Sequence, residues 1–142
     1  MLSQGYARTY RSNAVLTASP GQLVLMLYDG ALKALAMARD ALGRPESDRK
    51  RLEVVNQQLL KAQAIVAELQ SGLNFEAGGE VAKSLNSLYD YYNRRLFEAN
   101  LRKQAGPVIE VEKMIGDLRS GWAEMLSKQG AMQAAETVQG AA

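Results

Sequence analysis

The sequence predicts an all-α fold, an antiparallel up-and-down four-helix bundle, and three observations support it. The 142 residues include 21 Ala and 19 Leu but only 9 Val, 3 Ile and 3 Thr, and β-branched residues favour strands over helices. Apolar residues recur at steps of three and four along several segments of about 20 residues, which is the helical period. The connections between these segments are short, so neighbouring helices must run antiparallel.

The first helix is expected over residues 20–42. Ser19 can accept a hydrogen bond from the backbone at the helix start, Pro20 suits the first turn, and Gln22 can complete a capping box. Gly43 ends the helix. Residues 1–18 are polar and aperiodic, and we therefore expect them to form a separate N-terminal segment.

The second helix is expected to begin near Ser47 and to end at Ser71 and Gly72. Its apolar residues alternate in steps of three and four, at positions 52, 55, 59, 62, 66, 69 and 73. Such a seam is typical of helices that pack at a shallow angle. A loop over residues 74–79 should follow it.

The third helix is expected over residues 80–104, and a break at 105–107 separates it from the fourth. The inward residues predicted for the third helix are Val81, Leu85, Leu88, Tyr92, Leu96 and Ala99. Those predicted for the fourth helix are Val108, Val111, Ile115, Leu118, Trp122 and Met125. After Leu126 the residues become small and polar. We therefore expect an N-terminal cap over 1–18, a bundle over 19–127, and a flexible tail over 128–142.

Composition argues against catalysis. The chain has no Cys and no His, which excludes disulfides and thiolate sites and removes the commonest metal ligand and proton shuttle. The remaining candidates, the acids Asp29, Asp90, Glu98 and Glu110, are expected to be solvated or structural, with Asp29 paired to Lys33 one turn away. We expect a protein that is not an enzyme, with no cofactor, no metal and no small-molecule substrate.

Charge and hydropathy set further expectations. The net charge is +2, and the basic clusters at 49–51, 94–95 and 102–103 are mixed with acidic residues, so we expect no nucleic-acid partner. No run of about 18 apolar residues occurs, so no membrane span is expected. No secretory signal is present, and a cytoplasmic location is expected.

The first helix carries two apolar stripes where a bundle helix should bury one. The predicted core stripe comprises Leu23, Met26, Leu27, Gly30, Ala34, Met37 and Ala41. The second stripe comprises Leu25, Tyr28, Leu32 and Leu35. Burying each large side chain is worth roughly 1.5–3 kcal/mol, so something should cover the second stripe. Two ways of covering the second stripe remain open. Either the chain's own Tyr6 and Tyr10 cover it, or they cover it until an amphipathic helix of a partner displaces them.

Other positions in the third and fourth helices also have alternative interpretations. Tyr89 and Tyr92 flank the third seam, and we expect their hydroxyls at the bundle rim. Gly116 and Gly121 each cost about 1 kcal/mol relative to Ala inside a helix. They are either a local weakness or a place where a bound helix approaches closely.

Several motifs follow one another in order over about residues 6–126. They are Tyr10, Ser19-Pro20, residues 22–32, 61–69, 73–80 and 88–100, and finally Leu118-Arg119 and Trp122. Taken together, the set resembles the flagellin-specific export chaperone family, FliS. The sequence departs from the family at the 103–107 loop, which is not acidic, and after residue 127.

The resemblance implies a cytoplasmic bundle that binds the C-terminal, helix-forming segment of new flagellin in apolar grooves. Binding would prevent premature polymerisation and keep flagellin competent for the flagellar type III export gate, to which the loaded complex is presented. The N-terminal segment of the family covers part of the groove, and Tyr6 and Tyr10 match it. The partner-binding candidates are Tyr6, Tyr10, Leu25, Tyr28, Leu32, Leu35, Tyr89 and Tyr92. The alternative is a generic helical adaptor for another amphipathic or secreted partner.

Overall fold

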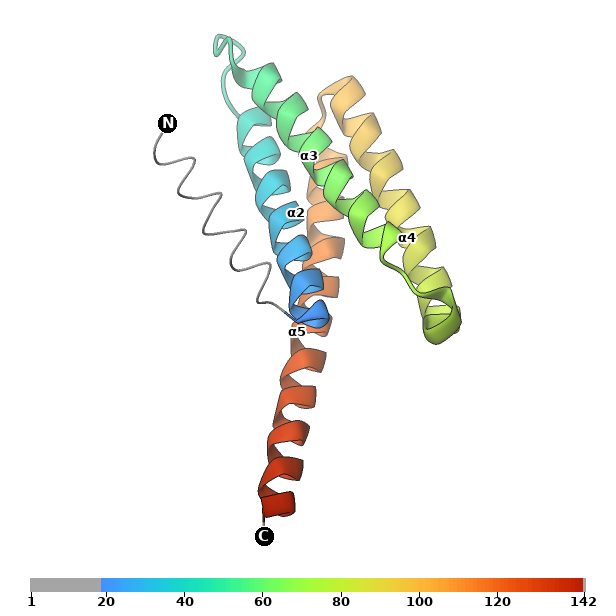
Figure 1. Ribbon diagram of the computed structural model, residues 1–142. Helices are drawn as coiled ribbons and strands as arrows, with labels where there is room; N and C mark the ends of the chain where they lie inside the picture. The colour runs from blue at the N-terminus through green and yellow to red at the C-terminus, as the bar shows by residue number, and fades with distance from the viewer. Residues whose placement is uncertain (1–18, 142) are drawn as a thin grey trace, which may run out of the picture.

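The computed structural model describes residues 19–141, except for the side chains of 133 and 136–141, and consists of four helices. These are α2 (Pro20–Leu42), α3 (Arg51–Ser71), α4 (Phe75–Arg102) and α5 (Ala105–Ala141). Both α2 and α4 pack against α3 and α5, so the four helices close a ring. Consecutive helices run in opposite directions (Figure 1). The predicted all-α antiparallel four-helix bundle is therefore confirmed.

Helix α2 begins and ends where the sequence predicted. The Ser19 hydroxyl accepts a hydrogen bond from the Gln22 backbone N–H at 3.2 Å, and the Gln22 side-chain oxygen accepts one from the Ser19 N–H at 3.3 Å. This reciprocal pair satisfies two backbone donors at the helix start and fixes its first residue.

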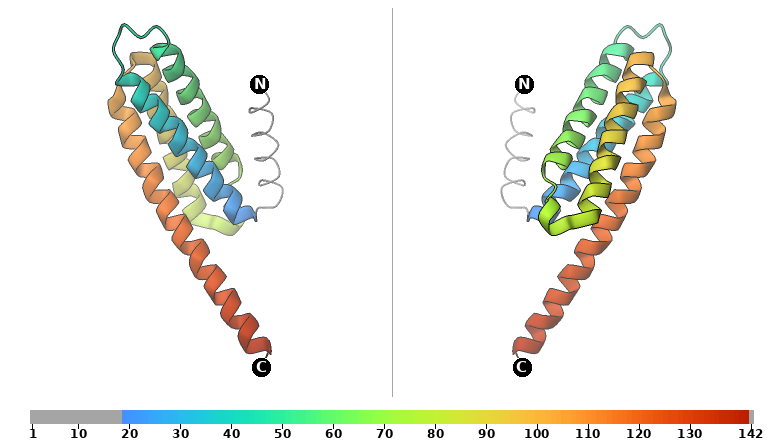
Figure 2. Two further views of the ribbon diagram at one scale, coloured as in Figure 1. Left: turned by 90° about the vertical axis from the view of Figure 1, so that its left-hand side faces the viewer. Right: turned by 90° about the vertical axis from the view of Figure 1, so that its right-hand side faces the viewer.

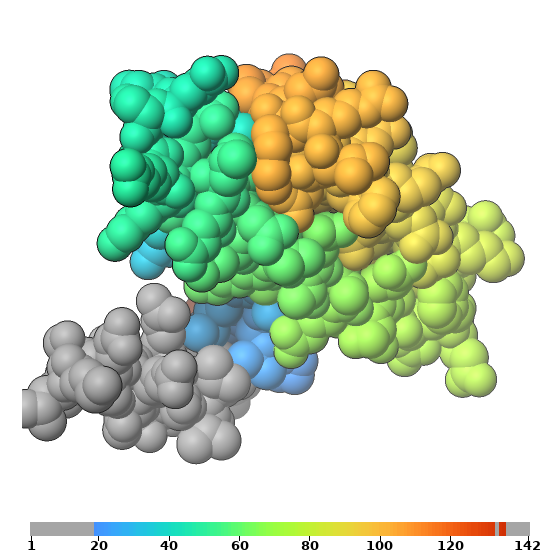
Figure 3. Space-filling view, turned by 90° about the horizontal axis from the view of Figure 1, so that it is seen from above, coloured from blue at the N-terminus to red at the C-terminus, as the bar shows by residue number. Residues whose placement is uncertain are grey.

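Helix α3 begins at Arg51 rather than near Ser47. The Asp48 N–H donates to the Pro45 carbonyl at 3.0 Å, and the Asp48 carboxylate accepts from the Lys50 N–H at 3.0 Å. The Arg51 N–H also donates to the Asp48 carbonyl at 3.2 Å, three residues back, instead of to the Ser47 carbonyl that an α-helix from Ser47 would use. The connection between α2 and α3 lies beside the one between α4 and α5, at the end of the bundle that Figure 3 shows.

The loop predicted over 74–79 is also wrong, because α4 begins at Phe75. The Asn74 side chain accepts a hydrogen bond from the Ala77 N–H at 3.1 Å and caps a first turn. Gly79, with φ 49° and ψ −124°, then kinks the helix away from this turn. A left-handed φ with this ψ is accessible to glycine and strained for any other residue.

Replacing Gly79 should therefore destabilise the protein. We expect Gly79→Ala to lower the free energy of unfolding by about 1–3 kcal/mol, measured by chemical denaturation. Gly116→Ala is the matched control, because a Cβ there has no described atom within 4 Å, and we expect it to raise stability by up to about 1 kcal/mol. Wild-type stability of Gly79→Ala would show that the kink is not required in solution.

Helix α5 is longer than predicted. The sequence placed its end near Leu126 and a tail after 127, but the helix continues to Ala141 and extends beyond the other three helices (Figures 1 and 2). Residues 127–132 are exposed. Lys128, Gln129, Ala131 and Met132 in this stretch are good helix formers, which favours continuation of the helix where its side chains are exposed. None of the four helices is long and apolar enough to cross a membrane.

The core lies between all four helices. Its largest fully buried side chains are Tyr92, Leu35, Leu59, Leu96, Ile115, Val55, Val66, Val108 and Val111. On α2 the core face is mostly alanine: Ala31, Ala34, Ala38 and Ala41 are all buried. Small side chains allow the neighbouring backbones to approach closely.

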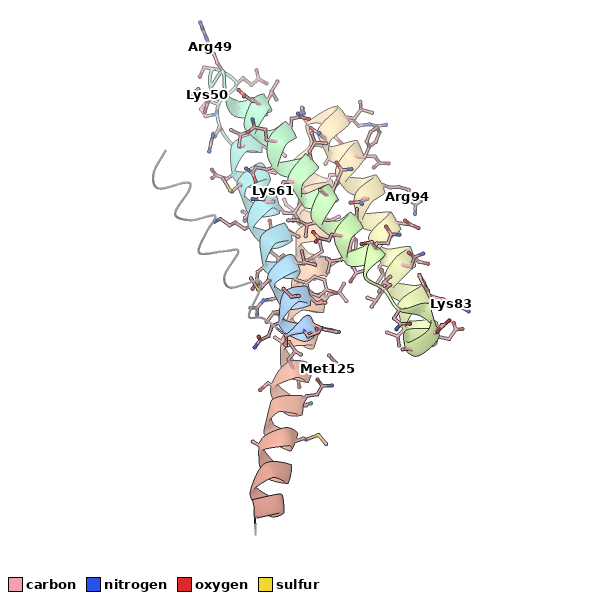
Figure 4. All side chains as sticks on the ribbon, in the orientation of Figure 1. Arg49, Lys50, Lys61, Lys83, Arg94 and Met125 are labelled. Carbon is pink, nitrogen blue, oxygen red and sulfur yellow. The ribbon has the colours of Figure 1, made fainter. Side chains whose placement is uncertain are left out.

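The predicted inward faces need correction. Met26 and Met37, predicted as core, are 37% and 43% exposed, whereas Tyr28 and Leu35, predicted for the second stripe, are buried in the core. The core face of α2 therefore lies between the two predicted stripes. Val81 and Met125 were also predicted to face inward, but they are 68% and 37% exposed. Both lie near the end of the bundle where the helices separate (Figure 4 labels Met125).

The four acidic residues considered for catalysis make structural contacts instead. Asp29 pairs with Arg119 of α5 at 2.6 Å, so the predicted Asp29–Lys33 pair is wrong. Glu98 pairs with Arg95 at 2.7 Å, and Asp90 accepts from Gln70 at 2.7 Å. Glu110 accepts from the Tyr91 hydroxyl and from Arg95, and these donors lower the pKa of Glu110.

Candidate functional site: an apolar groove at one end of the bundle

A groove of about 690 Å³ opens at the end of the bundle where α2 begins, α3 ends and α4 begins. Helix α5 passes the same end before it extends beyond the bundle (Figure 1). The groove is lined by Val24, Leu27, Tyr28, Glu68, Leu69, Gly72, Leu73, Asn74, Ala77, Gly78, Val81, Ala82, Leu85, Tyr89, Trp122 and Gln129. Its volume lies within the range of ligand-binding pockets, and its lining is mainly apolar, as is typical of them.

The groove has an exposed apolar rim and a buried floor. Val81 on α4 is 68% exposed, which is unusual for a β-branched aliphatic residue beside a core. Tyr28 and Tyr89 also line the groove, but they are only 3% and 2% exposed and therefore form its floor. The groove therefore offers exposed apolar surface at Val81 and a buried floor at the two tyrosines.

Trp122 fixes the wall that α5 contributes. Its indole N–H donates to the Gly21 carbonyl at 2.8 Å, which joins α5 to the first turn of α2. The ring is half-buried and packs against the core, as the seam of the fourth helix predicted. The only hydrogen-bond donor of the indole side chain is used by this contact.

The floor contains a pair of tyrosine hydroxyls. The Tyr28 and Tyr89 oxygens lie 2.6 Å apart in a hydrogen bond between α2 and α4. The prediction that the Tyr89 hydroxyl reaches the rim is therefore wrong. Burial raises the pKa of both phenols. It also raises the pKa of Tyr92, to about 12.

The six predicted partner-binding residues that the structure describes fall into three groups. Tyr28 and Tyr89 come together in the groove. Leu35 and Tyr92 are buried in the core and do not line the groove, so the prediction of a Tyr92 hydroxyl at the rim is also wrong. Leu25 and Leu32 are half-buried on α2 but do not line the groove. Tyr6 and Tyr10 lie outside the described residues.

The sequence analysis missed most of the groove. It assigned Leu27, Val81, Leu85 and Trp122 to the core and placed Leu73 at a turn, because the heptad seam continues through them. The loop predicted over 74–79 already separated Leu73 from Val81. A break of this kind does not show which of the neighbouring apolar residues stay uncovered, so no local signal marked the groove.

Other surfaces are less suited to an apolar helix. A depression of about 880 Å³ lies along α4, but a single helix lines it, with Asp90, Arg94 and Glu98 among its residues. Arg49 and Lys50 lie at one end of the bundle and Lys83 at the other (Figure 4). Among the described residues, no three acidic side chains gather where a metal ion could be held.

The comparisons with known proteins agree on one family. The family described as "Flagellar protein FliS" matches residues 2–129. A "Flagellar secretion chaperone FliS" of Bacillus subtilis is 37% identical over 91% of this chain and 92% of the relative. Proteins of the same name from Salmonella typhimurium and Escherichia coli are each 36% identical, over 88% and 92% of this chain and 90% and 93% of the relatives.

Proposed function

Because this chain belongs to the FliS family of flagellar proteins, we propose that it is a chaperone that binds the C-terminal, helix-forming segment of flagellin. The single observation that supports this most is the groove beside Val81, which leaves apolar side chains of α2, α3, α4 and α5 open at one end of the bundle. The groove would recognise an amphipathic helix by contacts with its apolar side chains, which recur at helical spacing.

We propose that the chaperone holds flagellin by burying the apolar side chains of the bound segment. Flagellin segments that form helical layers in a filament expose apolar stripes as monomers. Burying each large apolar side chain in the groove is worth roughly 1.5–3 kcal/mol, and a bound segment is unavailable for polymerisation. Binding that stabilises only the monomer shifts the assembly equilibrium by mass action and requires no reaction.

The finer parts of the proposal concern place and timing. We propose that binding occurs in the cytoplasm and that the loaded complex is presented to the flagellar type III export gate. The relatives that support this are named flagellar secretion chaperones. We further propose that residues 1–18, with Tyr6 and Tyr10, cap the groove until flagellin displaces them. This segment joins α2 one turn before Val24, which lines the groove.

Calorimetry tests the proposal with the full chain and a peptide of the flagellin C-terminal segment from the same bacterium. We expect saturable binding whose affinity changes less than about threefold between 50 mM and 500 mM salt, because apolar burial does not release counterions. A scrambled peptide without an apolar stripe is the control and should not bind. Saturation by unrelated amphipathic helices but not by flagellin would instead favour the generic adaptor.

A further inference from the structure

The tyrosine pair on the groove floor has more donors than it can use internally. Each hydroxyl carries one proton, and only one of the two protons can lie between oxygens 2.6 Å apart. Within the part of the chain that the structure describes, neither oxygen has another hydrogen-bond partner. One O–H of the Tyr28–Tyr89 pair therefore has no acceptor there.

The residues around the tyrosine pair supply no other acceptor for this proton. The lining residues nearest to the core are apolar, and the indole N–H of Trp122 is itself a donor that the Gly21 carbonyl already occupies. The polar lining residues Glu68, Asn74 and Gln129 are exposed and belong to the rim. In the open groove water can accept the remaining proton, but an occupant helix would exclude that water.

We propose that the remaining O–H of the Tyr28–Tyr89 pair donates a hydrogen bond to an acceptor on the apolar face of the bound helix. This inference rests on the proposed function and adds a selection rule to it. The preferred segment carries one acceptor, a side-chain amide or hydroxyl oxygen or a carbonyl at a helix end, among its apolar anchors.

The physical reason is the cost of an unsatisfied buried donor. A fully apolar helix would cover the hydroxyl and leave it without a partner, whereas a helix with an acceptor would satisfy it. Burial also keeps both phenols protonated, since it raises their pKa. A groove built this way discriminates between apolar helices of similar size.

The test compares affinity for the flagellin C-terminal segment by calorimetry. We expect the double variant Tyr28→Phe/Tyr89→Phe to bind about tenfold more weakly than wild type, because it removes the donor without changing ring shape. Purely apolar recognition predicts the opposite: two phenylalanines make the floor more apolar, so affinity would stay the same or rise. Binding within about twofold of wild type, or tighter, overturns the proposal.

Tyr92→Phe is the matched control. Tyr92 is also a buried tyrosine of α4, and its ring lies 6.1 Å from that of Tyr89 in an edge-to-face arrangement, but it does not line the groove. We expect this variant to bind within about twofold of wild type. An equal loss in the control would show that any missing buried hydroxyl weakens binding, and would overturn the proposal.

A second measurement keeps the test decisive if circular dichroism shows that the double variant does not fold. The wild-type chain should bind about tenfold more weakly to a flagellin peptide whose side-chain acceptors on the apolar face are replaced by Leu, and equal or tighter binding overturns the proposal. Failure of the wild-type chain to bind the segment would instead refute the proposed function. The two failures are therefore distinguishable.

Discussion

Val81→Asp should weaken binding of the flagellin segment by at least about 100-fold while leaving the fold intact. The side chain is 68% exposed in the unbound chain, so a carboxylate there stays in water. When a helix covers the groove, the same carboxylate would be buried without a partner, which costs several kcal/mol. Calorimetry measures the loss, and circular dichroism checks the helix content.

Ile109→Asp provides the matched control for this variant. Ile109 is also β-branched and 52% exposed, and it lies near the start of a helix, but it does not line the groove. We expect its affinity to remain within about twofold of wild type. Equal losses in the two variants, or none in either, would place the partner elsewhere.

Leu35→Ala should lower the free energy of unfolding by about 2–5 kcal/mol, one of the largest effects expected of a single substitution in this chain. Leu35 has no exposed surface, and closely packed neighbours relax only partly into the cavity that truncation leaves. For a domain of this size the melting temperature should fall by roughly 10 °C. Thermal and chemical denaturation followed by circular dichroism measure both quantities.

Leu60→Ala removes the same atoms from a leucine of α3 that is 54% exposed. We expect a change of less than about 0.5 kcal/mol. If Leu35→Ala were as mild as this control while flagellin binding fell, Leu35 would act as a surface residue, as the two-stripe pattern on the first helix first indicated.

The fold could be predicted because its signals are local. Ser19, Pro20 and Gln22 define the start of α2 through contacts within one turn. The three-four spacing from Leu52 to Leu69 likewise depends only on the helical period. Short connections then leave few arrangements other than antiparallel neighbours.

The groove could not be predicted in the same way, because spacing gives the direction of a side chain but not what faces it. Val81 and Leu85 continue the seam of α4, yet only Leu85 packs against the core. The kink at Gly79 depends on a backbone conformation that glycine permits but does not impose. The Tyr28–Tyr89 contact joins residues 61 positions apart, and no local pattern contains it.

The alanine-rich core face of α2 has a consequence for the whole molecule. Ala38 and Ala41 of α2 and Ala99 of α4 lie toward the end of the bundle away from the groove, whereas Tyr28 and Tyr89 lie nearer to the groove, which they line. On α2 and α4 the buried side chains are small at Ala41 and Ala99 and large at Tyr28 and Tyr89, and the helices diverge toward the groove (Figure 1). We expect larger residues at these alanines to change the spacing of the helices, and with it the width of the groove, without contacting the groove.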